Sequence, residues 1–330
     1  MLFYKINYFI NLGKKQMRIL FITDPLENFN IQKDSSFSLI KASFLRGYEI
    51  YQAGIEDLMV EGENLKVLAK EFVLNLDQDK SWFEFKNLNK NKLEISFFDL
   101  VFMRKDPPFN MKYIYATYLL ELAEKKGVRV INNPKALRDA NEKCFILNFP
   151  EFITRTVVSA DMAELKLFLK EEREVIYKPL DGMGGMSIFK VKLEDPNLSV
   201  ILELLTENGT LPIMAQKFIP EIKDGDKRIL LINGEAISHG LSRIPKEGEI
   251  RGNLAAGARG EVRELNSREL EVCAKIGPRL KKMGLIFVGL DMIGDYVTEI
   301  NVTSPTGIQE IEKITQQDIA GKILDAALVR

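Results

Sequence analysis

Residues 291–304 read D-M-I-G-D-Y-V-T-E-I-N-V-T-S, which predicts two short apolar strands joined by a turn. A bare carboxylate on the buried face of such a hairpin would lose its hydration unless a cation neutralised it. Glu299 and Asn301 are two positions apart and share a face, and Asp291 joins them only if the turn has an odd number of residues. We therefore predict a three-residue turn at 294–296 that places Asp291 opposite Glu299.

The turn type decides whether the two carboxylates converge. With a two-residue Gly-Asp turn, Asp291 would pair with Thr298 and point away from Glu299. Two converging acids and an amide oxygen would suit Mg²⁺, whose remaining positions would hold waters or phosphate oxygens. The alternative interpretation is an edge hairpin whose acids face solvent.

The composition is that of a globular protein of two or three domains, with 330 residues, 46% hydrophobic and 28% charged. A formal net charge of -1 provides no global basic field for nucleic acid or anionic membranes. Cys144 and Cys273 lack metal-ligand spacing, so we expect a reducing cytoplasm. The single histidine, His239, lies in a strand-like run and is interpreted as structural, so histidine-based triads and multi-histidine zinc sites are disfavoured.

The first sixteen residues are apolar but are interrupted by Lys5, and they are too short to span a bilayer. They also lack a small-residue cleavage site, so we interpret 1–16 as an N-terminal extension with Met17 as the expected start. No other stretch approaches the roughly eighteen uninterrupted apolar residues of a membrane helix, and we expect a soluble protein.

The hydrophobic pattern changes along the chain. Ser35-Ser36 is predicted to cap a helix that ends at Gly47, and a second helix is predicted from about 110 to Lys126. With predicted strands at 17–23, 48–52, 97–103 and 128–132, the first 135 residues or so indicate an open α/β sheet. From about Asn141 the pattern is α+β, with predicted strands at 175–180, 187–191, 213–219, 227–232, 236–244 and 285–302.

Two glycine-rich stretches indicate phosphate binding without matching a standard motif. D-G-M-G-G at 181–185 follows a strand but is followed by another strand, so the dinucleotide fingerprint fails and a dehydrogenase is disfavoured. In the stretch 245–260, Ala258-Arg259 replaces the Lys-Ser/Thr of a Walker A loop. A loop of this length is typical of a lid, and the alternative is a disordered surface loop.

Cations surround these loops. Lys178 lies inside the apolar strand V-I-Y-K-P-L, where an unpaired ammonium would lose its proton or require an anion. A nucleotide phosphate would supply that anion, and the alternative is an ion pair to a nearby acid. Lys143, Arg228 and Arg243 are the other candidates near the glycine-rich stretches.

The order of these blocks resembles the ATP-grasp ligases, and among them the bacterial glutathione synthetase family. The resemblance is carried by M-R-K-D-P-P-F at 103–109, K-P-L-D-G-M-G-G at 178–185, I-K-D-G-D-K-R at 222–228, R-G-N-L-A-A-G at 251–257 and T-E-I-N-V-T-S-P-T at 298–306. It extends from Met17 to about Glu312. The implied fold is an α/β N-terminal open-sheet domain at 17–138, followed by an α+β ATP-grasp fold with subdomains at 139–215 and 216–330 and a lid at 244–260.

The resemblance implies ATP-dependent joining of γ-glutamylcysteine to glycine through an acyl phosphate. Phosphoryl transfer needs positioning and charge neutralisation more than a proton-abstracting side chain, which suits a chain with one histidine and many cations. The implied partners are these small molecules and further copies of the chain, as a dimer or tetramer, with no nucleic acid or membrane.

One set of residues would bind ATP according to the resemblance. Lys143 and Lys178 would hold the phosphates, Asp226 would lie near the ribose, and the strand M-A-Q-K-F-I would meet adenine. The remaining contacts would come from that strand and the glycine-rich loop: Asp181, Gly182, Met183, Gly184, Gly185, Gln216, Lys217, Phe218 and Ile219.

A second set matches the family's metal and catalytic positions. Asp291, Glu299 and Asn301 match the ligands of Mg²⁺, for which Mn²⁺ could substitute. Arg228 and Arg243 match arginines that face the reacting carboxylate and would stabilise the charged acyl-transfer intermediate.

The lid would carry Arg251 and Asn253 and would keep water from the acyl phosphate. The substrate amino acids and peptide would be met by blocks from both ends of the chain: Lys33, Asp34, Ser35, Arg104, Thr303 and Ser304. An alternative for 104–106 is an ion-paired turn at a subunit contact.

Two other functions stay open. Another ATP-grasp carboxylate-amine ligase would use the same nucleotide machinery with different amino acids, although M-R-K-D-P-P-F argues against it. A nucleotide-binding module without turnover would be expected to lack a metal ligand or a phosphate lysine, and this sequence retains both.

Overall fold

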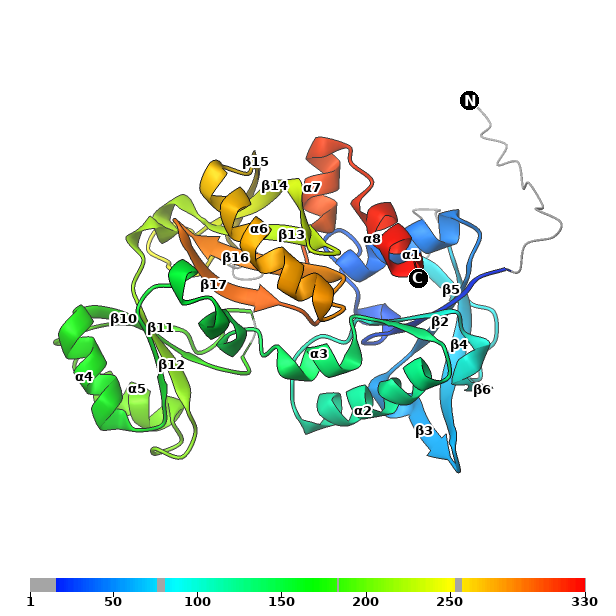
Figure 1. Cartoon of the computed structure of the whole chain (residues 1–330), viewed down its shortest axis with the longest axis horizontal. Coiled ribbons are helices and arrows are strands. Elements are labelled where there is room, and N and C mark those ends of the chain that lie inside the picture. Colours follow the sequence, from blue (N-terminus) through cyan, green and yellow to red (C-terminus); the bar gives the residue numbers. More distant parts are fainter. Residues whose placement is uncertain (1–15, 76–80, 183, 253–256, 330) are drawn as a thin grey trace.

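The computed structural model describes residues 16–75, 81–182, 184–252 and 257–329, and Figure 1 shows how they are arranged. The predicted extension 1–16 therefore lies almost wholly outside the described residues. The described residues form three sheets, and the connections between α-helices and strands include six short 3-10 turns: η1 (Leu26–Asn28), η2 (Ile55–Asp57), η3 (Ile95–Phe97), η4 (Cys144–Asn148), η5 (Pro150–Phe152) and η6 (Pro220–Asp224).

The first sheet has the order β3-β4-β2-β1-β7-β8, with β5 and β6 also paired to β4. β1 runs parallel to both β2 and β7. The unbroken apolar runs of β1 and β7 place these strands in the middle of the sheet, where both faces are covered. Its elements are β1 (Arg18–Ile22), α1 (Ser35–Leu45), β2 (Glu49–Ala53), β3 (Leu58–Glu61), β4 (Asn64–Leu74), β5 (Phe83–Phe85), β6 (Asn91–Glu94), β7 (Leu100–Met103), α2 (Met111–Lys125), β8 (Arg129–Ile131) and α3 (Pro134–Asp139).

The predicted open α/β sheet is confirmed, with two local differences. Asp34, rather than Ser35-Ser36, caps α1, because its side chain accepts a hydrogen bond from the Ser36 backbone N–H at 2.6 Å. The sequence pattern also did not predict β3 to β6. Among these strands, β4 pairs antiparallel with β2 at the side of the parallel strands, and β3 and β6 pair with β4.

The second sheet is antiparallel, in the order β11-β10-β12-β9, and has its own core against α4 and α5 on its outer side (Figure 1). Its elements are β9 (Thr156–Ser159), α4 (Met162–Glu172), β10 (Glu174–Pro179), β11 (Phe189–Lys192), α5 (Leu198–Leu205) and β12 (Ile213–Lys217). The predicted boundary between the two subdomains, at 215/216, falls inside β12. A boundary after Lys217 would keep this strand whole.

The third sheet is also antiparallel, in the order β15-β14-β13-β16-β17. The chain then returns to the first domain: α8 packs beside α1, where Arg46 pairs with Asp325 at 2.7 Å (Figure 1). The third sheet and the helices of this part of the chain are β13 (Asp226–Ile232), β14 (Glu235–Ile244), β15 (Arg259–Glu264), α6 (Ser267–Lys282), β16 (Phe287–Ile293), β17 (Tyr296–Asn301), α7 (Ile308–Thr315) and α8 (Ile319–Leu328).

Apolar side chains of the first and third sheets share one core. Ile19 and Phe21 of β1 belong to the same buried cluster as Leu230 and Ile232 of β13. These two parts therefore pack as neighbours across a common apolar layer, whereas most buried side chains of the second sheet form a separate core. Among the described residues, no helix has the length and apolar run needed to cross a bilayer.

Candidate functional site

A cavity of about 320 Å³ lies between the second and third sheets. Strands β10 and β12 form one wall, and β13, β14, β16 and β17 form the other. The first domain contributes Asp106 and Pro107. The cavity is thus lined by the second and third sheets and by the loop that follows β7, and charged groups of β13, β14, β16 and β17 gather on one wall.

The β16–β17 hairpin has a two-residue turn, Gly294-Asp295, so the predicted three-residue turn is wrong. Asp291 nevertheless pairs with Glu299, because a bulge shifts the register between Asp291 and Met292. The extra residue is Thr298, whose hydroxyl donates to the Asp291 carbonyl at 3.3 Å. The two-residue turn alone would place Asp291 and Glu299 on opposite faces of the hairpin. The extra residue in the bulge brings them back to the same face.

Asp291 is buried and paired with two arginines. Arg228 Nη2 lies 2.8 Å and Arg243 Nη2 lies 2.9 Å from Asp291 Oδ2, and Arg228 Nε also donates to Oδ1. Burial alone would raise the pKa of Asp291, but the two guanidinium groups outweigh it and lower that pKa to about 2. A side chain on Gly289 would meet Arg228, since an added Cβ would lie 2.8 Å from Arg228 Cδ.

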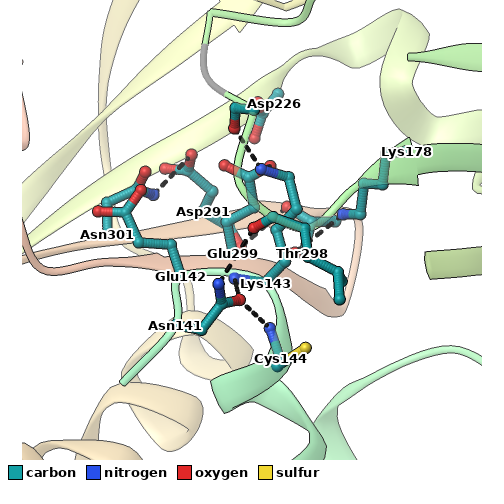
Figure 2. A network of polar contacts seen from close by, with 12 residues as sticks. Asn141, Glu142, Lys143, Cys144, Lys178, Asp226, Asp291, Thr298, Glu299 and Asn301 are labelled. Carbon is teal, nitrogen blue, oxygen red and sulfur yellow. Dashed lines mark hydrogen bonds and ion pairs between the residues drawn. The ribbon is translucent and has the colours of Figure 1, made fainter. Parts of the chain in front are cut away.

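Glu299 and Asn301 complete the face that carries Asp291 (Figure 2). Asn301 Nδ2 donates to Asp291 Oδ2 at 3.1 Å and to the Gly289 carbonyl at 3.2 Å, which leaves its amide oxygen as an acceptor. Glu299 is half-buried, and its Oε1 lies 3.8 Å from Lys143 Nζ. Two carboxylates and one amide oxygen are hard ligands of the kind Mg²⁺ prefers, so the donor set fits a divalent cation. No cluster of three or more His, Cys, Asp or Glu suited to a metal occurs in the described ranges.

Lys143 and Lys178 are both buried in the cavity wall. Lys143 donates to the Gly182 carbonyl. Lys178 Nζ donates to the Thr298 carbonyl at 3.2 Å (Figure 2). Burial lowers the pKa of Lys178 from its ordinary value of 10.5 to about 8, against the attraction of Glu299. The ammonium of Lys178 therefore lacks a close anion and is destabilised in the ligand-free protein.

Replacing Lys178 with methionine is expected to stabilise the ligand-free protein by about 1 to 3 kcal/mol at pH 7. The folded pKa of about 8 lies below the ordinary 10.5, so protonation opposes folding below pH 8 and has no effect above about pH 10.5, where the lysine is neutral in both states. The gain should fade across that interval in urea unfolding. Lys170→Met, at an exposed position of α4, is the control, and a gain equal to that of Lys178→Met would contradict the explanation.

The segment Gln216 to Ile219 lines the cavity at the end of β12. Gln216 Nε2 donates to Thr156 Oγ1 at 3.1 Å, and the Lys190 ammonium lies 3.4 Å from the Phe218 ring centroid. The segment places the apolar side chains of Phe218 and Ile219 at the end of the strand, which is a surface suited to a flat heterocyclic ring.

Asp226 lies in the arginine cluster, paired with Arg243. Its Oδ1 is buried with no hydrogen-bond partner among the described residues, and burial raises its pKa to about 6. Asp226 also lies against Gly252, where an added Cβ would be 2.7 Å from Asp226 Cβ. Asp226, the residue expected near the ribose, therefore lies beside Arg243 and beside Gly252 at the start of the lid.

The glycine-rich segments contribute backbone to the cavity. Gly182, Gly184 and Gly185 line it, whereas Asp181 does not, and Met183 lies outside the described residues. In the lid, Arg251 lines the cavity and pairs with Glu249 at 3.0 Å. Asn253 lies outside the described residues, and the ends of the predicted lid range belong to β14 and β15.

Four of the residues predicted to bind the peptide do not line the cavity: Lys33, Asp34, Ser35 and Arg104. Arg104 is buried at the junction of two domains, where its Nε donates to Ser36 Oγ at 3.1 Å and its Nη2 to the Pro305 carbonyl at 3.0 Å. Ser35 Oγ accepts from the Ile308 N–H at 3.3 Å. These groups hold the first domain against the segment after β17, and Thr303 and Ser304 of that segment do line the cavity.

Glu142, which no sequence motif singled out, precedes Lys143 and lines the cavity. Its Oε1 accepts hydrogen bonds from Val302 N at 3.0 Å, Thr303 N at 3.1 Å and Thr303 Oγ1 at 2.8 Å. Glu142 therefore fixes the chain just after Asn301. Its adjacency to Lys143 in N-E-K was the available signal, but the partners are about 160 positions away and no local pattern identifies them. His239 lies on β14 outside the cavity lining.

Known families and sequences match this chain along most of its length. The model of "Prokaryotic glutathione synthetase, N-terminal domain" matches residues 17–138, and that of "Prokaryotic glutathione synthetase, ATP-grasp domain" matches 142–316. A glutathione synthetase of Vibrio parahaemolyticus is 50% identical over 306 residues, covering 92% of this chain and 96% of the relative. One from Escherichia coli K12 is 49% identical over 311 residues, covering 94% and 97%.

Solved structures share the fold at low identity. D-cycloserine synthetase DcsG has a TM-score of 0.65 at 16% identity, covering 93% of this chain and 98% of that one. D-alanyl-alanine synthetase A from Vibrio cholerae has a TM-score of 0.60 at 12% identity, covering 95% and 98%. These likenesses support the fold, and the sequence relatives carry the information on family.

Proposed function

The chain belongs to the prokaryotic glutathione synthetase family, and from that premise we propose how its cavity joins γ-glutamylcysteine to glycine with ATP, giving glutathione, ADP and phosphate. The observation that carries the proposal is the meeting of two buried lysines, two buried arginines and the Asp291–Glu299–Asn301 face in one cavity. Such a site can hold a triphosphate and an acyl group side by side.

The nucleotide would lie along the second sheet. Lys143 and Lys178 would bind its phosphates, which would give Lys178 the anion it lacks in the ligand-free protein. The backbone of 181–185 would cover the phosphates, and Gln216 to Ile219 would meet adenine. Asp226 would approach the ribose, a role supported by its unpartnered Oδ1.

The ATP-grasp family uses ATP with a divalent metal, and we propose Mg²⁺, with Mn²⁺ as a substitute. Asp291, Glu299 and Asn301 would hold it. When bound, such an ion neutralises phosphate charge and orients phosphate oxygens. Asp291 is already ionised and held by Arg228 and Arg243, so it is available as a ligand without a change of protonation.

The chemistry would proceed in two steps. The cysteine carboxylate of γ-glutamylcysteine attacks the γ-phosphorus of ATP, forming an acyl phosphate and ADP. The amine of glycine then attacks the acyl carbon, and phosphate leaves as the peptide bond forms and the amine loses a proton. Arg228 and Arg243 are the buried cations beside Asp291, and we assign them to the negative charge that develops on the acyl oxygens.

The lid would protect the intermediate. An acyl phosphate is open to hydrolysis, and a closed loop would exclude water until the amine arrives. We place Arg251 and Asn253 in this role, with Arg251 at the cavity edge. Its partner Glu249 lies on the same loop, so Arg251 can exchange this exposed ion pair for a phosphate at little cost.

We also propose that the chain acts in the cytoplasm as a homo-oligomer, either a dimer or a tetramer. Cys144 and Cys273 are free, which suits a reducing compartment. Met111, Tyr115 and Tyr118 are exposed at helical spacing along α2 and would suit a contact between subunits. Light scattering would measure the assembly.

The direct test is product analysis by mass. With ATP, Mg²⁺, γ-glutamylcysteine and glycine, we expect a product of the mass of glutathione and one phosphate released per peptide formed. Leaving out either amino-acid substrate should abolish the product. Faster phosphate release with a different donor or acceptor than with this pair would instead identify another carboxylate-amine ligase.

A further inference from the structure

Asp106 lines the cavity but has no role in the function described above. It follows β7 in the first domain and reaches the segment after β17, where Ser304 hydrogen-bonds its carboxylate. β17 and the segment after it contact the cavity residues in chain order: Thr298 meets Lys178, Asn301 meets Asp291, and Thr306 meets Arg228 at 3.3 Å. Asp106 therefore belongs to the end of the cavity where the acyl group would react, and not to the lysine end.

Within the described part of the chain, Asp106, like Glu142, lacks the paired cation that three other acids of this cavity have. Asp226, Asp291 and Glu299 each pair with an arginine or lysine. Asp106 is in no ion pair of the described ranges, and its neighbour Lys105 pairs with Asp24 at 2.8 Å. Burial raises the pKa of Asp106, against the Ser304 hydrogen bond and the more distant Arg104. Its surroundings desolvate the carboxyl only in part, because Asp106 is exposed and lines the cavity, so a ligand can reach it.

A second polar group near this end is also unsatisfied. The Tyr113 hydroxyl at the start of α2 is buried and has no hydrogen-bond partner among the residues described. Its electrostatic neighbours are Glu142, Arg104 and Asp106, which places it beside this end of the cavity. The Tyr113 hydroxyl and the Asp106 carboxylate therefore leave hydrogen-bonding capacity for a ligand at this end of the cavity.

We propose that Asp106 is a specificity-determining residue that receives the ammonium group of an amino-acid substrate. The inference rests on the proposed function, in which both γ-glutamylcysteine and glycine carry an ammonium. Such a group has three N–H donors, and the Asp106 carboxylate and the Ser304 hydroxyl are acceptors that face the cavity together. The bond would be charge-assisted and would orient the substrate with its carboxylate turned toward the arginines.

Asp106→Asn is the test variant, because it removes the charge and keeps the size. We expect the KM for one amino-acid substrate to rise about 10- to 100-fold, the range for losing one charge-assisted hydrogen bond, while the KM for ATP stays unchanged. Asp106→Glu should recover part of the loss. Unchanged KM values for both amino-acid substrates would overturn the proposal, as would a loss confined to kcat.

A donor analogue separates the two sources of the ammonium. Glutarylcysteine is γ-glutamylcysteine without its α-amino group. If Asp106 binds the donor, wild type and Asp106→Asn should have equal KM values for this analogue, whereas the KM for γ-glutamylcysteine differs between them. If Asp106 binds the acceptor, only the KM for glycine should rise. Equal rises for γ-glutamylcysteine and its analogue, with no change for glycine, would overturn the proposal.

Asp24→Asn is the matched control. Like Asp106→Asn, this variant removes one negative charge. Asp24 anchors the loop that carries Asp106, because Asp24 Oδ2 accepts from the Asp106 N–H at 3.2 Å, but Asp24 does not line the cavity. A KM change as large in Asp24→Asn as in Asp106→Asn would assign the effect to loop position and would overturn the proposal. Failure of the wild-type protein to form glutathione would instead refute the proposed function, and the two failures are therefore distinguishable.

Discussion

Replacing Glu299 with glutamine is expected to lower kcat/KM for glutathione formation by at least about 100-fold, with the fold nearly as stable as before. The side chain is 24% exposed, and its ion pair to Lys143 is long, at 3.8 Å, so little folding energy depends on the charge. The proposed metal site, in contrast, would lose one of two anionic ligands. The KM for Mg²⁺ should therefore rise, and excess Mg²⁺ should restore part of the activity.

Phosphate release at several Mg²⁺ concentrations, together with urea unfolding, measures both parts of this prediction. Glu261→Gln is a suitable control, because Glu261 also pairs with a cation, Arg263 at 2.6 Å, but lies on β15 outside the cavity lining. Its kcat/KM should stay within about twofold of wild type, since exposed pairs contribute little. Normal turnover and normal Mg²⁺ dependence in Glu299→Gln would refute the metal assignment while leaving the fold intact.

Replacing Arg228 with alanine should have a large effect on both activity and stability. We expect kcat to fall about 100- to 1,000-fold, as when one donor to a developing oxyanion is removed. Arg228 is buried and bidentate to Asp291, and its loss leaves that carboxylate with Arg243 alone. The free energy of unfolding should fall by about 3 kcal/mol, the lower end for breaking a buried pair, because Arg243 remains.

Arg228→Lys separates the two effects. Lysine keeps a positive charge near Asp291 but cannot form the paired N–H bonds of a guanidinium, so the fold should recover more than the activity. We expect a kcat still at least about 10-fold below wild type with most of the stability restored. If stability and kcat recovered in parallel, Arg228 would act only by holding Asp291, and its assignment to the acyl oxygens would be withdrawn.

Local sequence patterns determined the parallel strands of the first sheet and most of the antiparallel strands that follow, but not β9 or β15. Each is a short apolar run bounded by turns, so its signal lies within about ten residues. The order of the quoted motifs also indicated the family, which the later comparisons confirm. The burial of Lys178 was predictable in the same way, because a lysine in an unbroken apolar strand has no exposed face to occupy.

Tertiary structure decided where the charged side chains meet. The pairing of Asp291 with Glu299 depends on a bulge at Thr298 that no count of turn residues reveals. Arg104 resembles a substrate residue in sequence, yet it binds the Pro305 carbonyl 201 positions away. Asp106 is brought to Ser304 by the packing of one domain on another. The period of the hydrophobic residues indicates whether a segment is buried or exposed. The partner of a charged side chain, in contrast, is set by contacts between segments that are distant in sequence, and only the folded chain brings those segments together.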